Sequence, residues 1–230
     1  WTICASRWRE TMTKWAIPDP DCALCPRQSA FIQKNRDLYP DFFNAPVPSF
    51  GDEPENVQLL IVGLAPGLRG ANRTGRPFTG DYAGDLLYET LARHKFAEGI
   101  YDKSPDDGLA LKDCRITNAV KCVPPENKVT GAEIKTCNQY LASEFEHLPN
   151  LKCILALGGV AHGAVLTTFG EKKSAHKFGH NVTHDLAGDL AGGLTLVNSY
   201  HCSRYNTNTG RLTEQMFDDV FVTIRGLIGG

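Results

Sequence analysis

Four cysteines in the sequence have the spacing of ligands. Cys22 and Cys25 form a C-x2-C pair beside Pro26, and Cys122 and Cys137 stand fifteen residues apart. Two thiolates from one tight turn and two more from a loop and the following helix can surround one metal ion or iron–sulfur cluster. Zinc ribbons usually use two C-x2-C knuckles, so the wide second pair favours iron–sulfur over zinc.

Other cysteines in the chain have a simpler interpretation. Cys114 and Cys153 lie within apolar, strand-like segments, where cysteine behaves as a small apolar side chain. The same interpretation suits Cys22 and Cys25 poorly, because they stand beside prolines and outside any strand-like segment. We therefore expect ligands at the four spaced positions and core packing at Cys114 and Cys153.

A glycine-rich segment follows the first strand-like run. It reads GLAPG at 63–67 and GANRTGRPFTGD at 70–81. Closely spaced glycines let backbone amides approach a ligand. The segment has neither the Gly-Lys-Ser/Thr of a Walker A loop nor the G-x-G-x-x-G spacing of a dinucleotide site. The alternative is an ordinary strand-to-helix turn, since such turns are commonly rich in glycine.

A second polar segment, SYHCSRYNTNTGRL, occupies positions 199–212. His201 stands there among hydroxyl, amide and guanidinium groups. A single histidine is more often structural than catalytic, but this one follows the last strand-like run, where open parallel sheets bind ligands.

Three further histidines recur every four residues, at 176, 180 and 184, and would suit a metal-binding helix. Gly179 and the β-branched Val182 and Thr183 weaken a helix there, and no fourth ligand is evident. We therefore do not expect a metal site at these histidines.

Four apolar, β-rich segments would position these motifs, at 57–62, 114–117, 152–157 and 194–198. Helical patterns separate them, which predicts a parallel sheet with helices on both faces. One of the helices should begin at Thr130, because Glu133 completes a capping box, and another should begin after Thr213. Ligands bind beyond the carboxyl ends of parallel strands, so the segments after each strand are the candidate site.

Bulk properties indicate an ordinary globular protein. The 230 residues, 42% hydrophobic and 22% charged, suit one domain spanning 1–230, with the proline-rich part at about 1–56 wrapping the sheet and supplying two of the spaced cysteines. The longest apolar run, 153–165, is too short to span a membrane, and no signal-peptide pattern is present. We expect a cytoplasmic, monomeric protein.

Charge gives no strong indication of a nucleic-acid partner. The chain has 24 Lys and Arg against 26 Asp and Glu, a net charge of −2, which counts slightly against DNA binding. Local basic stripes can still contact phosphates. Two sets of basic residues crowd single loops, namely Arg69, Arg73 and Arg76, and Lys172, Lys173 and Lys177.

At these motifs the sequence closely resembles the family 5 (UDGb-type) uracil-DNA glycosylases. The match covers the Gly63 to Asp81 loop, Asn118, the Ser199 to Leu212 segment and the four spaced cysteines, and so spans most of the chain. The resemblance implies a three-layer α/β/α sandwich around a four-stranded parallel sheet and a [4Fe–4S] cluster. It also implies excision of uracil, and of deaminated bases such as hypoxanthine and xanthine, from DNA in base-excision repair. Other branches of the superfamily carry an acidic or amide residue at the position of Ala65. This sequence resembles the UDGb branch in having alanine there.

On this resemblance, the flipped base is bound by Gly63, Ala65, Gly67, Phe78 and Asn118. Phe78 would stack on the base, and the Asn118 amide would hydrogen-bond its edge. The alternatives are a core aromatic at Phe78 and a turn residue at Asn118.

Catalysis is assigned to His201 and Asp81. His201 would hydrogen-bond the base oxygen as negative charge grows on the departing base. Because Ala65 cannot contact water through a polar group, Asp81 would position water or offset the charge of the cationic sugar. The alternative for Asp81 is a helix cap.

DNA contacts are expected from two segments: Arg69 and Arg73, and Ser203 to Asn206. Within the second, Arg204 would contact phosphate and Tyr205 would fill the space left by the flipped base, with Ser203 and Asn206 entering the groove beside them. Arg204 could also be a solvated surface charge.

Two other functions remain open. One is a non-catalytic iron–sulfur module for DNA binding or electron transfer, which the joint presence of His201, Asn118 and Phe78 disfavours. The other is a glycosylase that acts mainly on hypoxanthine or xanthine, because Ala65 leaves the pocket roomier and less polar on one side.

Overall fold

The computed structural model describes residues 15–187 and 193–229, and its centre is a six-stranded sheet in the order β1-β5-β2-β6-β8-β7. The four middle strands run parallel. They are β5 (Cys114–Asn118), β2 (Leu59–Gly63), β6 (Cys153–Leu157) and β8 (Thr195–Ser199). All four coincide with the predicted segments to within two residues at either end, which confirms the parallel sheet.

The edges of the sheet were not predicted. Short antiparallel strands flank the parallel core, with β1 (Phe50–Gly51) paired to β5 and β7 (Thr183–Asp185) paired to β8. A separate two-stranded sheet joins β3 (Ala97–Glu98) to β4 (Ala110–Leu111).

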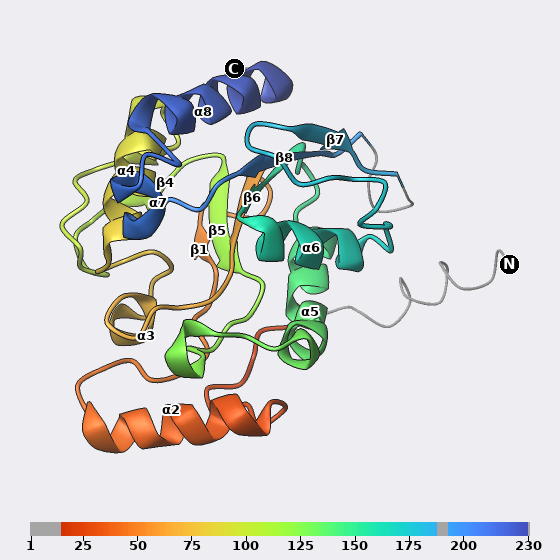
Figure 1. Cartoon of the computed structure of the whole chain (residues 1–230). Helices are drawn as coiled ribbons and strands as arrows, with labels where there is room; N and C mark the ends of the chain where they lie inside the picture. The colour runs from red at the N-terminus through yellow and green to blue at the C-terminus, as the bar shows by residue number, and fades with distance from the viewer. Residues whose placement is uncertain (1–14, 188–192, 230) are drawn as a thin grey trace, which may run out of the picture.

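Two helical layers cover the sheet (Figure 1). α4 (Tyr82–Arg93) and α8 (Glu214–Ile228) pack on one face. α5 (Gly131–Glu146) and α6 (Gly159–Thr168) pack on the other. The fold is therefore a three-layer α/β/α sandwich, which confirms the predicted class.

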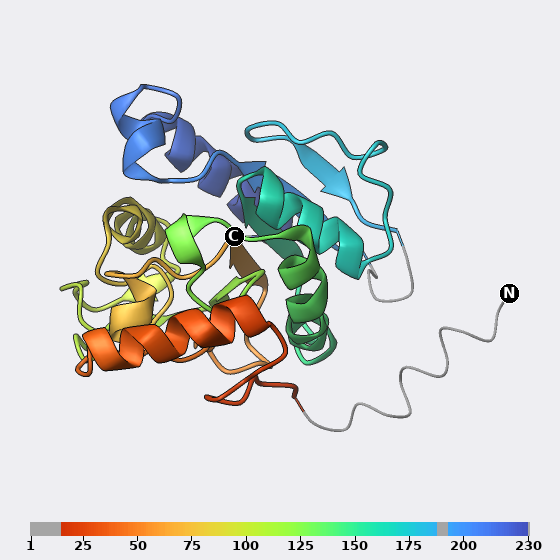
Figure 2. The ribbon, with the colours of Figure 1, turned by 60° about the horizontal axis from the view of Figure 1, so that its bottom comes forward.

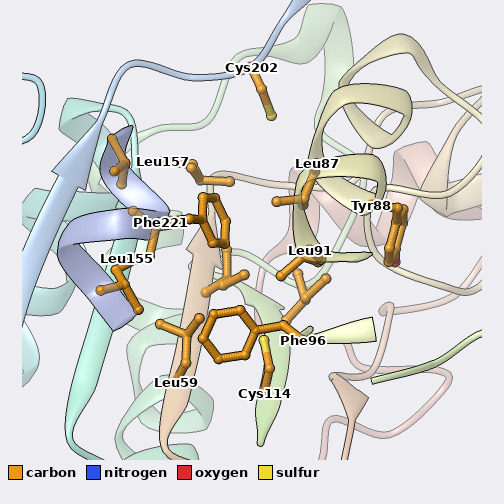
Figure 3. Close-up of a cluster of buried hydrophobic side chains, with 14 of the residues drawn as sticks. Leu59, Leu87, Tyr88, Leu91, Phe96, Cys114, Leu155, Leu157, Cys202 and Phe221 are labelled. Atoms are coloured by element: carbon orange, nitrogen blue, oxygen red, sulfur yellow. The ribbon is translucent and has the colours of Figure 1, made fainter. Parts of the chain in front are cut away.

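Strand β2 explains why both faces are covered. Leu59 and Ile61 join the core beneath α4 and α8, while Leu60 and Val62 join the core beneath α5 and α6. Successive side chains of a strand point to opposite faces, so an uninterrupted apolar strand has to be buried on both. Figure 3 shows the first core, where Phe221 of α8 approaches Leu87 and Leu91 of α4 above the sheet.

Two helices begin where the sequence predicts. Thr130 accepts a hydrogen bond from the Glu133 backbone at 3.2 Å, and the Glu133 carboxylate accepts one from the Thr130 backbone at 2.8 Å. Thr213 caps α8 by accepting from Met216 at 3.1 Å. Both predicted caps are confirmed.

The segment before β1 contains α2 (Pro26–Leu38), which lies alongside the loops that follow β2 and β5 (Figure 2). Ile32 of this helix packs with Cys122 and Val123, and Leu68 adjoins the cluster. The remaining short helices are α3 (Ala71–Thr74), the 3₁₀ turn η1 (Pro125–Asn127) and α7 (Arg204–Asn208). Across 15–187 and 193–229, no helix combines the length and the apolar character needed to cross a membrane.

Candidate active site

A cavity of about 370 Å³ opens beyond the carboxyl ends of the parallel strands, a volume typical of small-molecule sites. The predicted residues that line it are Ala65, Gly67, Phe78, Asp81, Asn118, His201 and Ser203. They come from the loops after β2 and β8 and, for Asn118, from the last residue of β5, as expected for an open parallel sheet. The segment after β6 does not line this cavity. Its His162 is buried, and its ring nitrogens lie 2.8 Å from Asn198 Oδ1 and from the His176 carbonyl oxygen.

Phe78 and Asn118 form the inner wall. Both are buried, at 7% and 3% exposure. A Cβ atom on Gly63 would overlap Asn118 Oδ1 and would lie 2.7 Å from Phe78 Cζ, so Gly63 permits the amide and the ring to approach each other. Gly63 itself does not line the cavity; its lack of a side chain lets Asn118 and Phe78 form this wall. Phe78 also belongs to the apolar core beneath α4, so the cavity and the core share this ring.

His201 forms the side of the cavity next to Phe78. The two rings are stacked with centroids 5.9 Å apart and planes inclined by 27°. Burial lowers the pKa of His201 below its ordinary value, so the imidazole is neutral at pH 7. A neutral imidazole donates one hydrogen bond through its single N–H. The Asn206 amide donates to the His201 carbonyl at 2.8 Å and fixes this part of the chain.

Asp81 combines a structural contact with a place in the cavity. Its Oδ1 accepts a hydrogen bond from the Gly84 backbone at 3.3 Å, which caps α4. The pKa of the Asp81 carboxyl group is raised above its ordinary value, and burial is the main cause. A Cβ on Gly70 would lie 2.9 Å from Asp81 Cγ, so the glycine-rich loop leaves room for this carboxylate.

Polar and aromatic side chains also lie on the surface around α3 and α7. Arg69 and Arg73 are exposed, and Arg204 lies 5.1 Å above the ring of Tyr82. Tyr205 is 73% exposed. Ser203 caps α7 by accepting from the Asn206 backbone at 3.4 Å.

Arg76 differs from the other two arginines of its loop and does not join them as a basic stripe on the surface. Its guanidinium forms two hydrogen bonds to the Asp107 carboxylate, at 2.8 and 2.7 Å, and the side chain is only 5% exposed. This pairing holds the pKa of Asp107 well below its usual range. Arg76 therefore holds the 102–109 segment against the core instead of facing solvent.

The four spaced cysteines line one separate hollow. Cys25 precedes α2, Cys122 follows β5, and Cys137 lies within α5. Cys22 Sγ lies 3.8 Å from the Tyr140 hydroxyl, and the Lys121 backbone donates to Cys137 Sγ at 3.3 Å. The tertiary structure thus brings together two pairs that are about 100 residues apart in the chain.

The other sulfur and imidazole groups differ from these four. Cys114 and Cys153 are fully buried within strands, as predicted for core cysteines. His176, His180 and His184 lie on no common helix. Within the part of the chain that the structure describes, no three His, Cys, Asp or Glu side chains are arranged to hold a single metal ion. The four spaced cysteines share a hollow but do not form such a group.

Six residues of the cavity wall were given no role from the sequence. Leu64, Pro66 and Ala71 lie in the glycine-rich segment and Ala83 lies at the start of α4. The other two are Pro124 and Asn127. Both belong to the loop between Cys122 and α5. Their only signal in the sequence was that this loop follows the strand-like segment that ends near Asn118.

Comparison with known proteins agrees with this geometry. Residues 50–225 match the family model of the uracil DNA glycosylase superfamily. The chain is 42% identical over 214 residues to a type-5 uracil-DNA glycosylase of Thermus thermophilus, covering 90% of this chain and 94% of that one. Similar proteins with the same name occur in Pyrobaculum aerophilum, at 37% identity over 87% of this chain and 86% of the relative, and in Mycobacterium leprae, at 38% over 90% and 92%. This chain therefore belongs to the type-5 branch of the uracil-DNA glycosylase superfamily.

Proposed function

We propose that this chain flips uracil out of DNA and hydrolyses its bond to deoxyribose, leaving an abasic site. The observation that supports this most directly is the convergence of Phe78, Asn118, His201 and Asp81 on one cavity of about 370 Å³. A planar base can stack on the aromatic ring while the amide hydrogen-bonds its edge. The other two groups, His201 and Asp81, can stabilise the charges that develop on the base and on the sugar during the reaction.

In the proposed reaction, the base leaves with the electron pair of the glycosidic bond and water adds to the sugar carbon. Neutral His201 donates a hydrogen bond to the base oxygen as that oxygen becomes anionic. Ionised Asp81 orients the water, takes up its proton or balances the cationic sugar.

The same cavity suits other deaminated bases. Ala65 contributes only a methyl group, so no polar side chain at this position rejects the larger rings of hypoxanthine or xanthine. We propose that these two bases are also substrates.

DNA would lie across the surface formed by α3 and α7. Exposed Arg69, Arg73 and Arg204 would contact phosphates, and exposed Tyr205 would occupy the space left by the flipped base. Ser203 and Asn206 would enter the groove beside them. We expect the protein to act on DNA as a monomer, which sedimentation with and without a duplex would test.

A direct test is base release by the purified full chain from oligonucleotides that contain uracil, hypoxanthine, xanthine or a thymine mismatch, in single and double strands. We expect abasic sites from uracil and from the two deaminated purines. Binding to every duplex with release of no base would overturn the proposal and would favour a non-catalytic iron–sulfur DNA-binding module.

We further propose that the four cysteines hold a [4Fe–4S] cluster. The donor set fits this group, because four thiols, and no carboxylate or imidazole, line the hollow. Cubane clusters take four thiolates, and they are larger than a single ion. The ligands would fasten α2 to β5 and α5, so the expected role of the cluster is structural.

Iron and sulfide analysis tests the cluster. Anaerobically purified protein should contain about four iron and four sulfide per chain. Cys25→Ser should lower iron content and folding yield, whereas Cys153→Ala, which changes a buried thiol outside the hollow, should leave iron content unchanged. Stoichiometric zinc without iron would contradict the assignment.

A further inference from the structure

Tyr101 lies behind the cavity wall and has no role in the scheme above. It is half-buried, in the segment that Arg76 and Asp107 hold against the core, and it does not line the cavity. Its hydroxyl makes two hydrogen bonds to the loop that forms the wall. It accepts one from the Gly80 backbone N–H and donates one to the Phe78 carbonyl, each at 3.2 Å. One hydroxyl group thus bridges the two ends of the 78–80 turn.

This turn joins two residues of the proposed reaction. Phe78 opens the turn and forms the inner wall of the cavity, and Asp81 directly follows Gly80, which ends it. A group bonded to both ends of the turn therefore fixes the aromatic ring and the carboxylate relative to each other. Misplacement of a reacting group by about 1 Å can slow a reaction about 10²-fold. The arrangement of this short turn thus matters for catalysis.

The backbone of the turn needs support from outside. Phe78 has a φ of 53°, and Gly80 has a φ of 91°. Glycine adopts a positive φ without steric cost, but an aromatic residue in the left-handed region is strained. Such a residue keeps its conformation only where the surrounding structure imposes it. Loss of the two bonds to Tyr101 would let Phe78 relax towards an ordinary φ.

Surrounding groups hold the Tyr101 hydroxyl in place. The ring stacks on that of Tyr88 with centroids 4.5 Å apart, and the Arg76 guanidinium lies 5.8 Å from its centroid. A Cβ on Gly84 of α4 would lie 2.5 Å from the hydroxyl oxygen and would overlap the Phe78 carbonyl oxygen, so the helix approaches this closely only because residue 84 is glycine. Burial raises the pKa of Tyr101 to about 12, so the hydroxyl stays protonated and can donate and accept at once.

We propose that Tyr101 is a positioning residue, whose hydroxyl holds the Phe78 ring and the Asp81 carboxylate in their reactive arrangement. This inference rests on the proposed function and deepens it. It predicts that a phenol outside the cavity affects both binding of the flipped base and cleavage.

The test removes the hydroxyl and nothing else. Tyr101→Phe keeps the stacked ring and loses both hydrogen bonds. Tyr88→Phe is the matched control, because it removes another hydroxyl from the same ring stack, one that donates to the Pro77 carbonyl at 2.6 Å, and leaves the two bonds of Tyr101 in place. Each full-length variant is compared with the wild type in melting temperature and in single-turnover cleavage of uracil. Affinity is measured with a duplex that carries a deoxyuridine fluorinated on the sugar, which resists cleavage.

We expect Tyr101→Phe to weaken binding of the fluorinated duplex about 3- to 10-fold, as loss of a hydrogen bond would, and to slow cleavage at saturating enzyme about 10-fold. Tyr88→Phe should lower the melting temperature at least as much, because its hydroxyl is the more deeply buried of the two. It should change affinity and cleavage by less than about 2-fold.

Double variants distinguish positioning from a general loss of stability. In Asp81→Asn the carboxylate no longer acts, so adding Tyr101→Phe should slow cleavage by less than about 3-fold further. In Phe78→Leu the stacking ring is absent, so adding Tyr101→Phe should leave the Kd for the fluorinated duplex nearly unchanged. A structural role alone would give the same factor in every background.

Two results would overturn the role of Tyr101. One is wild-type affinity and cleavage in Tyr101→Phe. The other is a loss that is equal in the single and double variants, or shared by Tyr88→Phe, since either would make Tyr101 a structural residue only. Failure of the wild type to release any base would instead refute the proposed glycosylase activity, and the Kd values would still decide whether Tyr101 acts through Phe78.

Discussion

Replacing Asp81 with asparagine separates catalysis from helix capping. Asparagine can accept the same hydrogen bond from Gly84, but it can neither take up a proton from water nor balance a cation. We therefore expect Asp81→Asn to fold normally and to cleave uracil slowly.

The structure gives the sign of the effect on stability. Burial raises the folded-state pKa of Asp81 above 3.8, so the stabilisation from its protonated form is present below that pH and is lost as pH rises through the folded pKa. Above the folded pKa the ionised carboxylate is a cost to the fold. Because asparagine caps helices about as well as aspartate, the melting temperature of Asp81→Asn should be equal to or slightly above that of the wild type.

The expected effect on chemistry is much larger. Loss of a positioned general base commonly lowers a rate by about 10²-fold or more, which corresponds to about 2.7 kcal/mol of transition-state stabilisation. Single-turnover cleavage of a uracil duplex should also lose the rise with pH that ionisation of Asp81 gives the wild type.

The assay needs melting temperature, duplex affinity and cleavage from the same preparations. Asp85→Asn is the matched control, because Asp85 lies one turn along α4, outside the cavity, and pairs with Lys103 at 2.8 Å. A folded, DNA-binding Asp81→Asn protein that cleaves uracil at the wild-type rate would refute the catalytic role and leave Asp81 as a helix cap.

Three other substitutions test the remaining assignments. His201→Ala should slow single-turnover cleavage about 10²- to 10³-fold with duplex affinity nearly unchanged, and unaltered cleavage would remove His201 from the mechanism. Phe78→Leu should preserve most of the core packing but lose about 1–3 kcal/mol of base stacking, so an unchanged Kd for a substrate duplex would assign Phe78 to the core alone. Arg76→Met should destabilise the fold by about 3–5 kcal/mol at pH 7, because it leaves the buried carboxylate of Asp107 without its charged partner. Normal melting of Arg76→Met would contradict this. In the wild type the depressed pKa of Asp107 means that its contribution is present above the unfolded-state pKa and is lost as pH falls through the folded one.

The sequence alone determined the parts of this protein that depend on neighbouring residues. The four parallel strands were visible as apolar runs, because strands buried on both faces cannot alternate with polar residues. The capping box at Thr130 and Glu133 was visible because both partners lie within one turn. Residues after the strands, such as Asn118 and His201, were identifiable because parallel strands bring their carboxyl ends to one edge.

Tertiary structure decided what depends on partners far apart in the chain. Arg69, Arg73 and Arg76 look alike in sequence, yet only Arg76 is buried, because its partner Asp107 comes from a segment 31 residues away. The edge strands β1 and β7 are too short to show a pattern of their own and exist through pairing with β5 and β8. Asn127 was missed for the same reason. Its place at the cavity depends on a left-handed turn and on Arg27, about 100 residues earlier, and neither leaves a local signal in the sequence.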